Sequence, residues 1–383
     1  MKNQKVLIVL ALFISSLTYG QNARFSQIWS SPIQFNPSLT GKFDGKYRLT
    51  AHYSSQSADF PVEATINHQN VSFDAKFGKY KASGDEAPVT KAVSVANPTA
   101  GKDEIYSKSR MHGYWGAGLN YYHYGYKTSP FDATFISASL ARHFYNKSNK
   151  YYGFGIQGTY ASGKLDETKG TAYDAEISGG GFRYPTPSTP NSTTIGTRKN
   201  TKTYVDFNGG AYYGMNTEAV MFELGGAMHH LFYPLNDAMG SDSESKLRHR
   251  ITAHSILRLK LNPKWGIVQR NMYWQEGLYY RSKSFNDSLQ IVSFWTGLEF
   301  YKIDPSKKIN LNFGFYTRSF RTLMPYLNLN VTNFANIRYS YEQPINSKKF
   351  YAYNATRSEL ALIFTYKRYT SPGTRFYRKT NFW

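Results

Sequence analysis

The amino-acid sequence predicts an all-β fold, a transmembrane antiparallel β-barrel of about 14 strands. Apolar and polar residues alternate with period two through most of the chain, as in strands with one apolar and one polar face. The alternating segments run about 9 to 13 residues, which is the length of a tilted membrane-crossing strand rather than of a strand in a soluble sheet. Aromatic residues make up 17% of the chain, with 33 Tyr and 26 Phe. Such side chains are favoured at the two interfaces of a bilayer.

The N-terminal residues have the pattern of a secretory signal peptide. Lys2 and Lys5 precede an apolar run at 6–14, and we expect cleavage between Gly20 and Gln21. The run is too short for a membrane span, which takes about 20 apolar residues. The chain contains no Cys, so we expect no lipoprotein processing, disulfide or cysteine chemistry. The sequence therefore predicts an exported protein.

The clearest alternation places Leu327, Leu329 and Val331 on one face of a strand and Asn328 and Asn330 on the other. We expect the apolar face to contact lipid and the polar face to line the lumen. Other polar faces carry Arg, Lys and Glu in mid-strand, which suits a water-filled lumen. The expected strands lie at roughly 46–55, 66–77, 113–124, 131–144, 151–162, 202–213, 219–231, 248–261, 265–280, 289–301, 309–319, 323–331, 335–343 and 357–368.

These strands divide the chain into four parts: a signal peptide at 1–20, an N-terminal segment at 21–45, the barrel at 46–368 and a C-terminal tail at 369–383. The segment at 21–45 fits neither a strand nor a helix well. We therefore expect it to plug the lumen or to lie below the barrel in the periplasm.

The connections alternate between short and long, as in barrels with tight periplasmic turns and long external loops. The expected turns are at 146–150, 214–218, 262–264, 304–305 and 332–334, and the expected loops are at 163–201, 232–247, 281–288 and 344–356. One stretch disagrees with this pattern. Residues 78–112 are long, polar and Lys-rich, yet the strand count places them in the periplasm. They are either a periplasmic insert or the sign of a miscounted strand.

Polar residues on the inner faces are candidates for a network inside the barrel. Asp206 and Asn208 share a face, where they either dock a plug or partner strand or supply ordinary lumen polarity. Arginines on inner faces either attract an anionic solute or pair with carboxylates. The residues considered for such pairs are Arg48, Arg250, Arg258 and Arg338 with Asp206, Glu342 and Glu359. We take Asp206, Asn208, Arg258, Arg338 and Glu342 as the candidate lumen network.

The sequence contains no convincing catalytic or metal-binding pattern. The 9 His residues are scattered, whereas zinc requires three or four convergent ligands. A lipid-modifying barrel enzyme requires Ser and His on adjacent strands at an outer rim, and no G-x-S-x-G motif occurs. We therefore expect no enzyme activity, no cofactor and no metal.

Short motifs in a fixed order along the mature chain resemble those of a known family. They are Arg24-Phe25-Ser26-Gln27, Asn36-Pro37-Ser38, Gly41, Ser72-Phe73-Asp74, Gly116-Ala117-Gly118-Leu119, Asp206-Phe207-Asn208 with Gly210, Asn216, His230-Leu231, Lys264-Trp265, Pro325, Tyr339-Ser340-Tyr341 and Ser358-Glu359-Leu360. In this order they are similar to the PorP/SprF family of the type IX secretion system. Phe25, Asn36 and Pro37 of the opening motifs become candidate partner-contact residues through this resemblance.

The resemblance implies a non-enzymatic outer-membrane barrel that assists secretion or surface anchoring of a partner such as a large adhesin. The implied partners are type IX components or a large secreted surface protein, besides outer-membrane lipid. The net charge of +21 favours an acidic partner surface, and export argues against nucleic acid. The alternative is an outer-membrane channel or transporter for a hydrophobic or anionic solute, which requires an open lumen.

Overall fold

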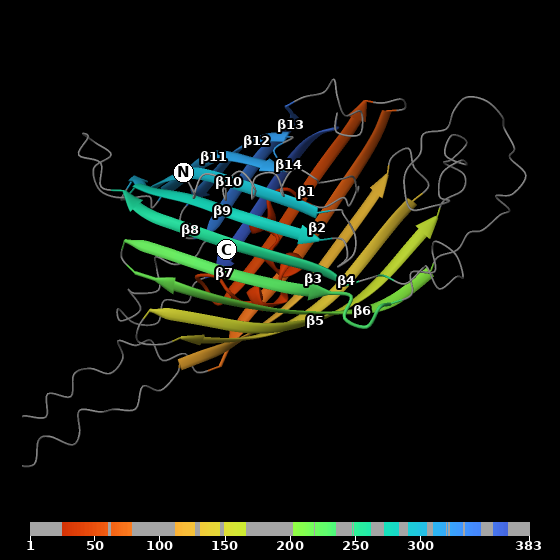
Figure 1. Ribbon diagram of the computed structural model, residues 1–383, viewed down its shortest axis with the longest axis horizontal. Coiled ribbons are helices and arrows are strands. Elements are labelled where there is room, and N and C mark those ends of the chain that lie inside the picture. Colours follow the sequence, from red (N-terminus) through yellow and green to blue (C-terminus); the bar gives the residue numbers. More distant parts are fainter. Residues whose placement is uncertain are drawn as a thin grey trace, which may run out of the picture.

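The chain forms a closed antiparallel β-barrel in the computed structural model (Figure 1). The structure describes residues 25–59, 63–78, 112–126, 131–145, 149–165, 202–217, 219–234, 247, 249–261, 272–282, 290–304, 309–318, 320, 322–331, 334–345 and 355–366. The expected signal peptide, the C-terminal tail and most of the stretches 78–112 and 163–201 lie outside these ranges. No helix among the described residues is long and apolar enough to cross a membrane.

Fourteen strands follow one another around the barrel, and β1 closes it by pairing with β14. They run from 10 to 16 residues, so the prediction of about 14 membrane-length strands is confirmed. The strands are β1 (Tyr47–Asp59), β2 (Glu63–Phe77), β3 (His112–Tyr126), β4 (Phe131–Tyr145), β5 (Lys150–Leu165), β6 (Lys202–Asn216), β7 (Val220–His229), β8 (Arg250–Leu261), β9 (Met272–Ser282), β10 (Gln290–Asp304), β11 (Ile309–Arg318), β12 (Thr322–Val331), β13 (Ala335–Pro344) and β14 (Ala355–Tyr366).

The strand boundaries differ from the expected ones mainly around β9 and β10. The expected strand at 265–280 is described from Met272 onward, and β10 continues to Asp304 through a register shift where we expected a turn. β2 and β3 pair directly from Ile66–Tyr126 to Phe77–Trp115, so the barrel has no further strand between them.

Burial alternates along each strand between a lumen face and an outer face. On β12, Leu323 and Leu327 are 43% and 48% exposed on the outer face, while Met324 and Asn328 are buried on the inner face. The expected orientation of Leu327 and Asn328 is therefore confirmed. Large apolar residues are exposed on the outer face all around the barrel, among them Leu49, Val71, Leu119, Ile136, Ile156, Val205, Phe313 and Leu360.

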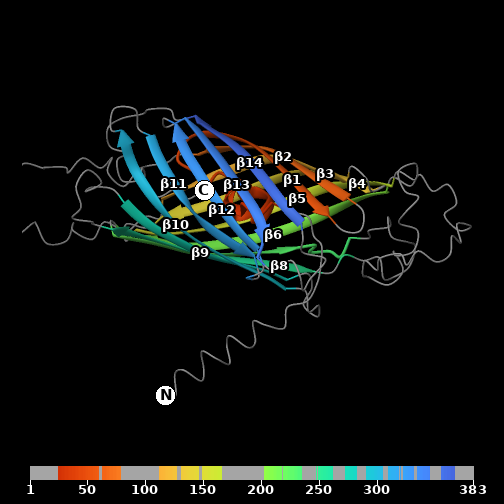
Figure 2. The ribbon, with the colours of Figure 1, turned by 90° about the horizontal axis from the view of Figure 1, so that it is seen from above.

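The described N-terminal residues lie inside the barrel, where Figure 2 shows their short coils in the middle of the ring of strands. They form η1 (Ile28–Ser30), α2 (Pro32–Phe35) and η2 (Pro37–Leu39). Proline begins both α2 and η2, a position where its missing N–H has no helical partner to lose. We call residues 25–43 the plug.

The plug begins and ends beside β1. Phe25 stacks on His52 in the middle of β1, and Phe43 lies under Arg48 near the beginning of that strand. The chain then enters β1 beside the last residue of β14, where the Lys46 amide donates to the Tyr366 carbonyl at 2.8 Å. We call this end of the barrel the terminal end and the opposite one the loop end.

The outer belt can be tested with two matched substitutions on β12. Leu327→Arg lies in mid-strand, so we expect it to lower the free energy of unfolding by about 2–4 kcal/mol in lipid vesicles. Leu323→Arg lies near the strand end and should cost about 0–1 kcal/mol, because a guanidinium there reaches the interface. The measurement is urea unfolding of the refolded barrel. Equal losses would contradict the placement of the belt.

Candidate functional site

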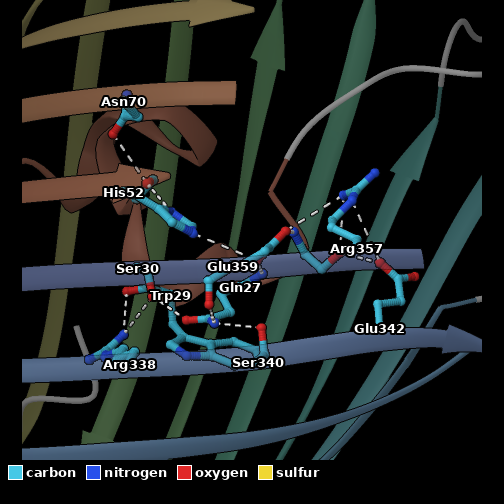
Figure 3. A network of polar contacts seen from close by, with 12 residues as sticks. Gln27, Trp29, Ser30, His52, Asn70, Arg338, Ser340, Glu342, Arg357 and Glu359 are labelled. Carbon is cyan, nitrogen blue, oxygen red and sulfur yellow. Dashed lines mark hydrogen bonds and ion pairs between the residues drawn. The ribbon is translucent and has the colours of Figure 1, made fainter. Parts of the chain in front are cut away.

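The first residues of the plug are held by side chains from β13 and β14 (Figure 3). The Glu359 carboxylate accepts the backbone N–H groups of Ser26 and Gln27 at 2.6 and 2.8 Å. The Gln27 amide donates to the Ser340 hydroxyl at 2.5 Å, and Arg338 Nη1 donates to the Trp29 carbonyl at 2.9 Å. Wall side chains thus form hydrogen bonds with plug backbone groups that have no strand or helix partner. Burying these groups without a partner would raise the free energy of the folded state.

A second layer of charge supports this contact. Glu342 accepts the Ser26 hydroxyl at 2.7 Å and the Arg318 guanidinium at 2.8 Å. Arg357 lies 3.8 Å from Glu342 and 3.6 Å from Glu359, and it also donates to Ser26 Oγ at 3.1 Å. The two carboxylates are buried together only because guanidinium groups lie between and beside them.

The middle of the plug is held by β5, β6, β7 and β8. The Asn36 amide donates to the carbonyls of Ala211 and Gly226 at 3.3 and 3.1 Å. On its other side the Asn36 oxygen accepts the Ser38 N–H at 2.9 Å and so caps η2. This one side chain both shapes the plug and attaches it to two strands.

Asn208 acts on the plug through another residue. It donates to Gln157 at 3.0 Å, and the Gln157 amide donates to the Ile33 carbonyl at 3.3 Å. Asn208 therefore positions the amide that contacts the plug and does not itself touch it.

The last turn of the plug meets charged and aromatic side chains. The Gly41 N–H donates to Asp74 at 2.7 Å, and Asp74 also accepts two hydrogen bonds from Arg48, at 2.8 and 2.7 Å. Lys42 forms a buried ion pair with Glu223 and lies 4.3 Å from the centre of the Tyr212 ring. Burial lowers the pKa of the Lys42 ammonium below its ordinary value, while the Glu223 carboxylate opposes this shift.

Aromatic rings fill the space between the plug and the wall. The Phe25 and His52 rings stack with centroids 3.7 Å apart, and Phe35 lies 4.7 Å from Tyr279. Trp29 packs against Trp295, Tyr316 and Tyr326 with centroids 5.3, 5.9 and 5.5 Å apart. Apolar packing as well as hydrogen bonds thus holds the plug in the lumen.

Glycines in the wall allow the plug backbone to come close. A methyl group on Gly116 would collide with the Thr40 carbonyl, and one on Gly155 would collide with the Pro37 carbonyl. Pro37 lies directly on the wall for this reason, and side chains at these two wall positions would push the plug out of place.

The residues of the expected lumen network face inward but take part in different contacts. Asp206 and Asn208 both contact His230, which lies 2.9 Å from Asp206 through its ring and donates its backbone N–H to Asn208 at 3.2 Å. His230 has a φ of 61° and follows the last residue of β7. Arg258 pairs with Glu299 at 2.7 Å. The expectation that the arginines pair with Asp206, Glu342 or Glu359 is wrong for Arg258, as it is for Arg48, which pairs with Asp74.

Sequence reasoning missed Lys42 and Glu223, which lie 181 residues apart. No local pattern relates two residues at such a distance, and only the barrel brings them together. Asp74 and Gly116, in contrast, are members of motifs that the sequence already singled out.

One group of residues has the composition of a nucleophile, base and acid. Ser31 Oγ lies 3.0 Å from Nδ1 of His52, whose Nε2 lies 3.6 Å from Glu359. Ser31 also donates to Asn70 at 3.2 Å, and both oxygens of Glu359 accept plug N–H groups. The arrangement therefore serves the docking of the plug. Within the described ranges, no three His, Asp or Glu side chains are placed to hold a metal ion.

A cavity lies between the plug and the wall on the loop-end side. Phe25, Phe35 and Tyr316 contribute aromatic surface to it, and Arg281 and Arg318 contribute positive charge. Both arginines stand at or next to the last residue of their strands, β9 and β11.

A closed antiparallel barrel with membrane-length strands, an apolar outer belt and a polar, filled lumen defines an outer-membrane β-barrel protein. The chain belongs to the family of type IX secretion system membrane proteins PorP/SprF, whose model matches residues 17–364. It is thus an outer-membrane barrel of the type IX secretion system. No curated protein matches the sequence.

Solved outer-membrane barrels are similar only in their general architecture. The P. putida toluene transporter TodX aligns at 10% identity with a TM-score of 0.39, over 91% of this chain and 95% of that one. BamA from Haemophilus ducreyi aligns at 11% identity with a TM-score of 0.39, over 84% of this chain and 70% of that one. Similarity at this level carries no information about substrate or partner.

Glu359→Gln tests the attachment of the plug. We expect the population of barrels with an undocked plug to rise roughly 10- to 100-fold, since a hydrogen bond to a charged group contributes about 1.5–3 kcal/mol. Ion conductance across planar bilayers and protease cleavage of the N-terminal segment measure this population. Glu299→Gln is the control, because Glu299 is an inward carboxylate paired with Arg258. Identical behaviour of the two variants would refute the role of Glu359.

Proposed function

We propose that this barrel is a non-enzymatic part of the type IX secretion system that assists secretion or surface anchoring of a partner protein, such as a large adhesin. The observation that carries the proposal is the filled lumen. Buried polar contacts from Ser26 to Lys42 tie the plug to strands on all sides. A barrel with this interior offers protein-binding surfaces at its two ends rather than a path for solutes.

The chain organisation in this proposal follows the expected division. Residues 1–20 are removed on export, residues 21–45 plug the lumen, and the barrel at 46–368 ends in a tail at 369–383. Outer-membrane lipid surrounds the belt, and other type IX components or the secreted protein contact the ends.

The transporter alternative is less well supported because the polar groups that would guide a solute are engaged in holding the plug. Arg338 donates to the Trp29 carbonyl and Arg48 to Asp74. The enzyme alternative is less well supported because Ser31 is buried against His52 and Asn70 within the plug contact.

The net charge of +21 supports an acidic partner surface. Charge complementarity of this kind acts mainly on the rate of association and weakens with added salt.

Deletion of the gene tests the proposed role. We expect an intact outer membrane from which one or more large exported proteins have disappeared at the cell surface, measured by surface labelling and proteomics. Loss of one substrate would indicate a dedicated anchor, and loss of all substrates a core component. Normal display of every type IX substrate, together with a lost solute uptake, would overturn the proposal in favour of a transporter.

A disulfide that locks the plug separates the two alternatives in one protein. The Thr40 and Ser139 side chains are hydrogen-bonded at 2.8 Å, and the chain has no Cys of its own. In the double variant Thr40→Cys, Ser139→Cys, we expect oxidation to leave surface display unchanged, because secretion or anchoring does not require the lumen to open. The single variants are the controls. An uptake activity that falls on oxidation and returns on reduction would contradict this expectation.

A further inference from the structure

The outer face of β9 carries a carboxylate in the middle of the lipid-facing belt. Burial alternates along this strand, with Gln275 and Gly277 on the inner face and Trp274, Glu276 and Leu278 on the outer face. Leu278 is 47% exposed, as an outward position should be in the isolated barrel. Glu276 therefore points to the membrane and away from the lumen.

The outward neighbours of Glu276 leave its charge uncompensated. The strand register places it beside Leu257 on β8 and Thr296 on β10. Thr296 is the one polar neighbour among these, and its hydroxyl already accepts the Trp274 indole N–H at 2.9 Å. Within the ranges that the structure describes, Glu276 makes no hydrogen bond or ion pair.

The position is too deep for the carboxylate to reach water easily. Glu276 is four residues from Met272 and six from Ser282 along a strand of 11 residues. A strand tilted by about 40° rises about 2.5 Å per residue along the membrane normal, so Glu276 lies about 10 Å from one described end and about 15 Å from the other. This depth falls inside an apolar belt about 25 Å tall.

An ionisable side chain at such a depth is costly when it faces hydrocarbon. Arg142 is another outward charged residue of the barrel wall, and neighbouring aromatic rings stabilise it. Its guanidinium lies over the rings of Trp115 and Phe144, 5.1 and 5.3 Å from their centres, and it is close to the end of β4. Among the described residues, Glu276 has no comparable contact.

We propose that the outer face of β8–β10 around Glu276 binds a second protein within the outer membrane, and that this partner presents a Lys or Arg side chain to the carboxylate. Apolar packing against Trp274 and Leu278 would surround the ion pair and exclude lipid. In this low-dielectric setting the attraction between the carboxylate and a partner cation is strong, and a carboxylate without such a partner is costly.

Two other occupants fit the observations less well. Lipid amines lie at the interface, about 10 Å away along the normal. In a second copy of this chain, the outward cation in the described strand interiors is Arg142 on β4, five strands away from β9. A two-fold contact that pairs each Glu276 with the other copy's Arg142 would need both strands in a single interface, and they lie on different sides of the barrel.

Photocrosslinking of the full-length protein in its native membranes tests the proposal. The probe is benzoylphenylalanine at position 278, and the control is the same probe at position 205, an outward residue of β6 that is 57% exposed. We expect an adduct with one outer-membrane protein from position 278 and none from 205. Glu276→Lys should reduce the adduct roughly tenfold or more, because it places two cations together in the belt.

Two further variants decide the outcome. Glu276→Leu should fold at least as well as the natural barrel in lipid, since it removes a lipid-facing charge, yet it should also lose the adduct. The crosslinked peptide of the partner should contain a Lys or Arg whose replacement by Glu restores the adduct in the Glu276→Lys background. An unchanged adduct in both variants, an adduct only with a second copy of this chain, or no adduct from position 278 would overturn the proposal.

The outcome does not depend on the proposed role in secretion. If Glu276→Leu loses the adduct while every type IX substrate remains on the surface, the interface stands without supporting a function in display. If the gene deletion leaves display normal but the adduct behaves as expected, the proposed function fails and the interface remains.

Discussion

Every buried backbone N–H and carbonyl inside the barrel needs a partner, and this requirement shapes the rest of the structure. The short turns of the plug pair nine of its backbone N–H groups with carbonyls of the plug itself, and the remaining groups need partners elsewhere. The wall supplies partners for several of these, with Glu359 for two N–H groups and Arg338 for a carbonyl, and the Asn36 side chain of the plug in turn donates to wall carbonyls. The inner faces of the strands are polar because they are complementary to an irregular polypeptide.

The same requirement explains why the family-like motifs are short and far apart. Phe25, Asn36 and Gly41 belong to the plug, while Asp74, Gly116, Ser340 and Glu359 belong to wall positions that contact it. Each of these residues is one side of a contact whose other side lies elsewhere in the chain. These motif residues therefore share the docking of the plug, an interface that draws on distant parts of the sequence and forms no compact local signature.

The sequence predicts the strands well because the alternation of apolar and polar residues depends on each strand alone. Leu327 and Asn328 face the expected sides on the basis of local alternation alone. It predicts the contacts across the lumen poorly, because the partner of an inward charge depends on barrel geometry: Arg258 meets Glu299 and Arg338 meets the plug backbone. The plug at 25–43 has no periodicity from which its three short helical turns, or their place in the lumen, can be derived. The outward orientation of Glu276 follows from the strand register, and this residue was not singled out from the sequence.

A filled lumen moves the functional surfaces of this barrel to its ends and its outer wall. Side chains such as Glu342 and Arg357 that would give an open pore its selectivity are committed to holding Ser26 in place. A transporter needs a path through the interior of its barrel. In this barrel the interior side chains instead hold the N-terminal segment in one conformation. A rigid, plugged barrel is suited to presenting fixed surfaces to other proteins. The carboxylate on β9 fits the same logic, because an ionisable side chain on the lipid-facing wall is costly and a covering protein would compensate it.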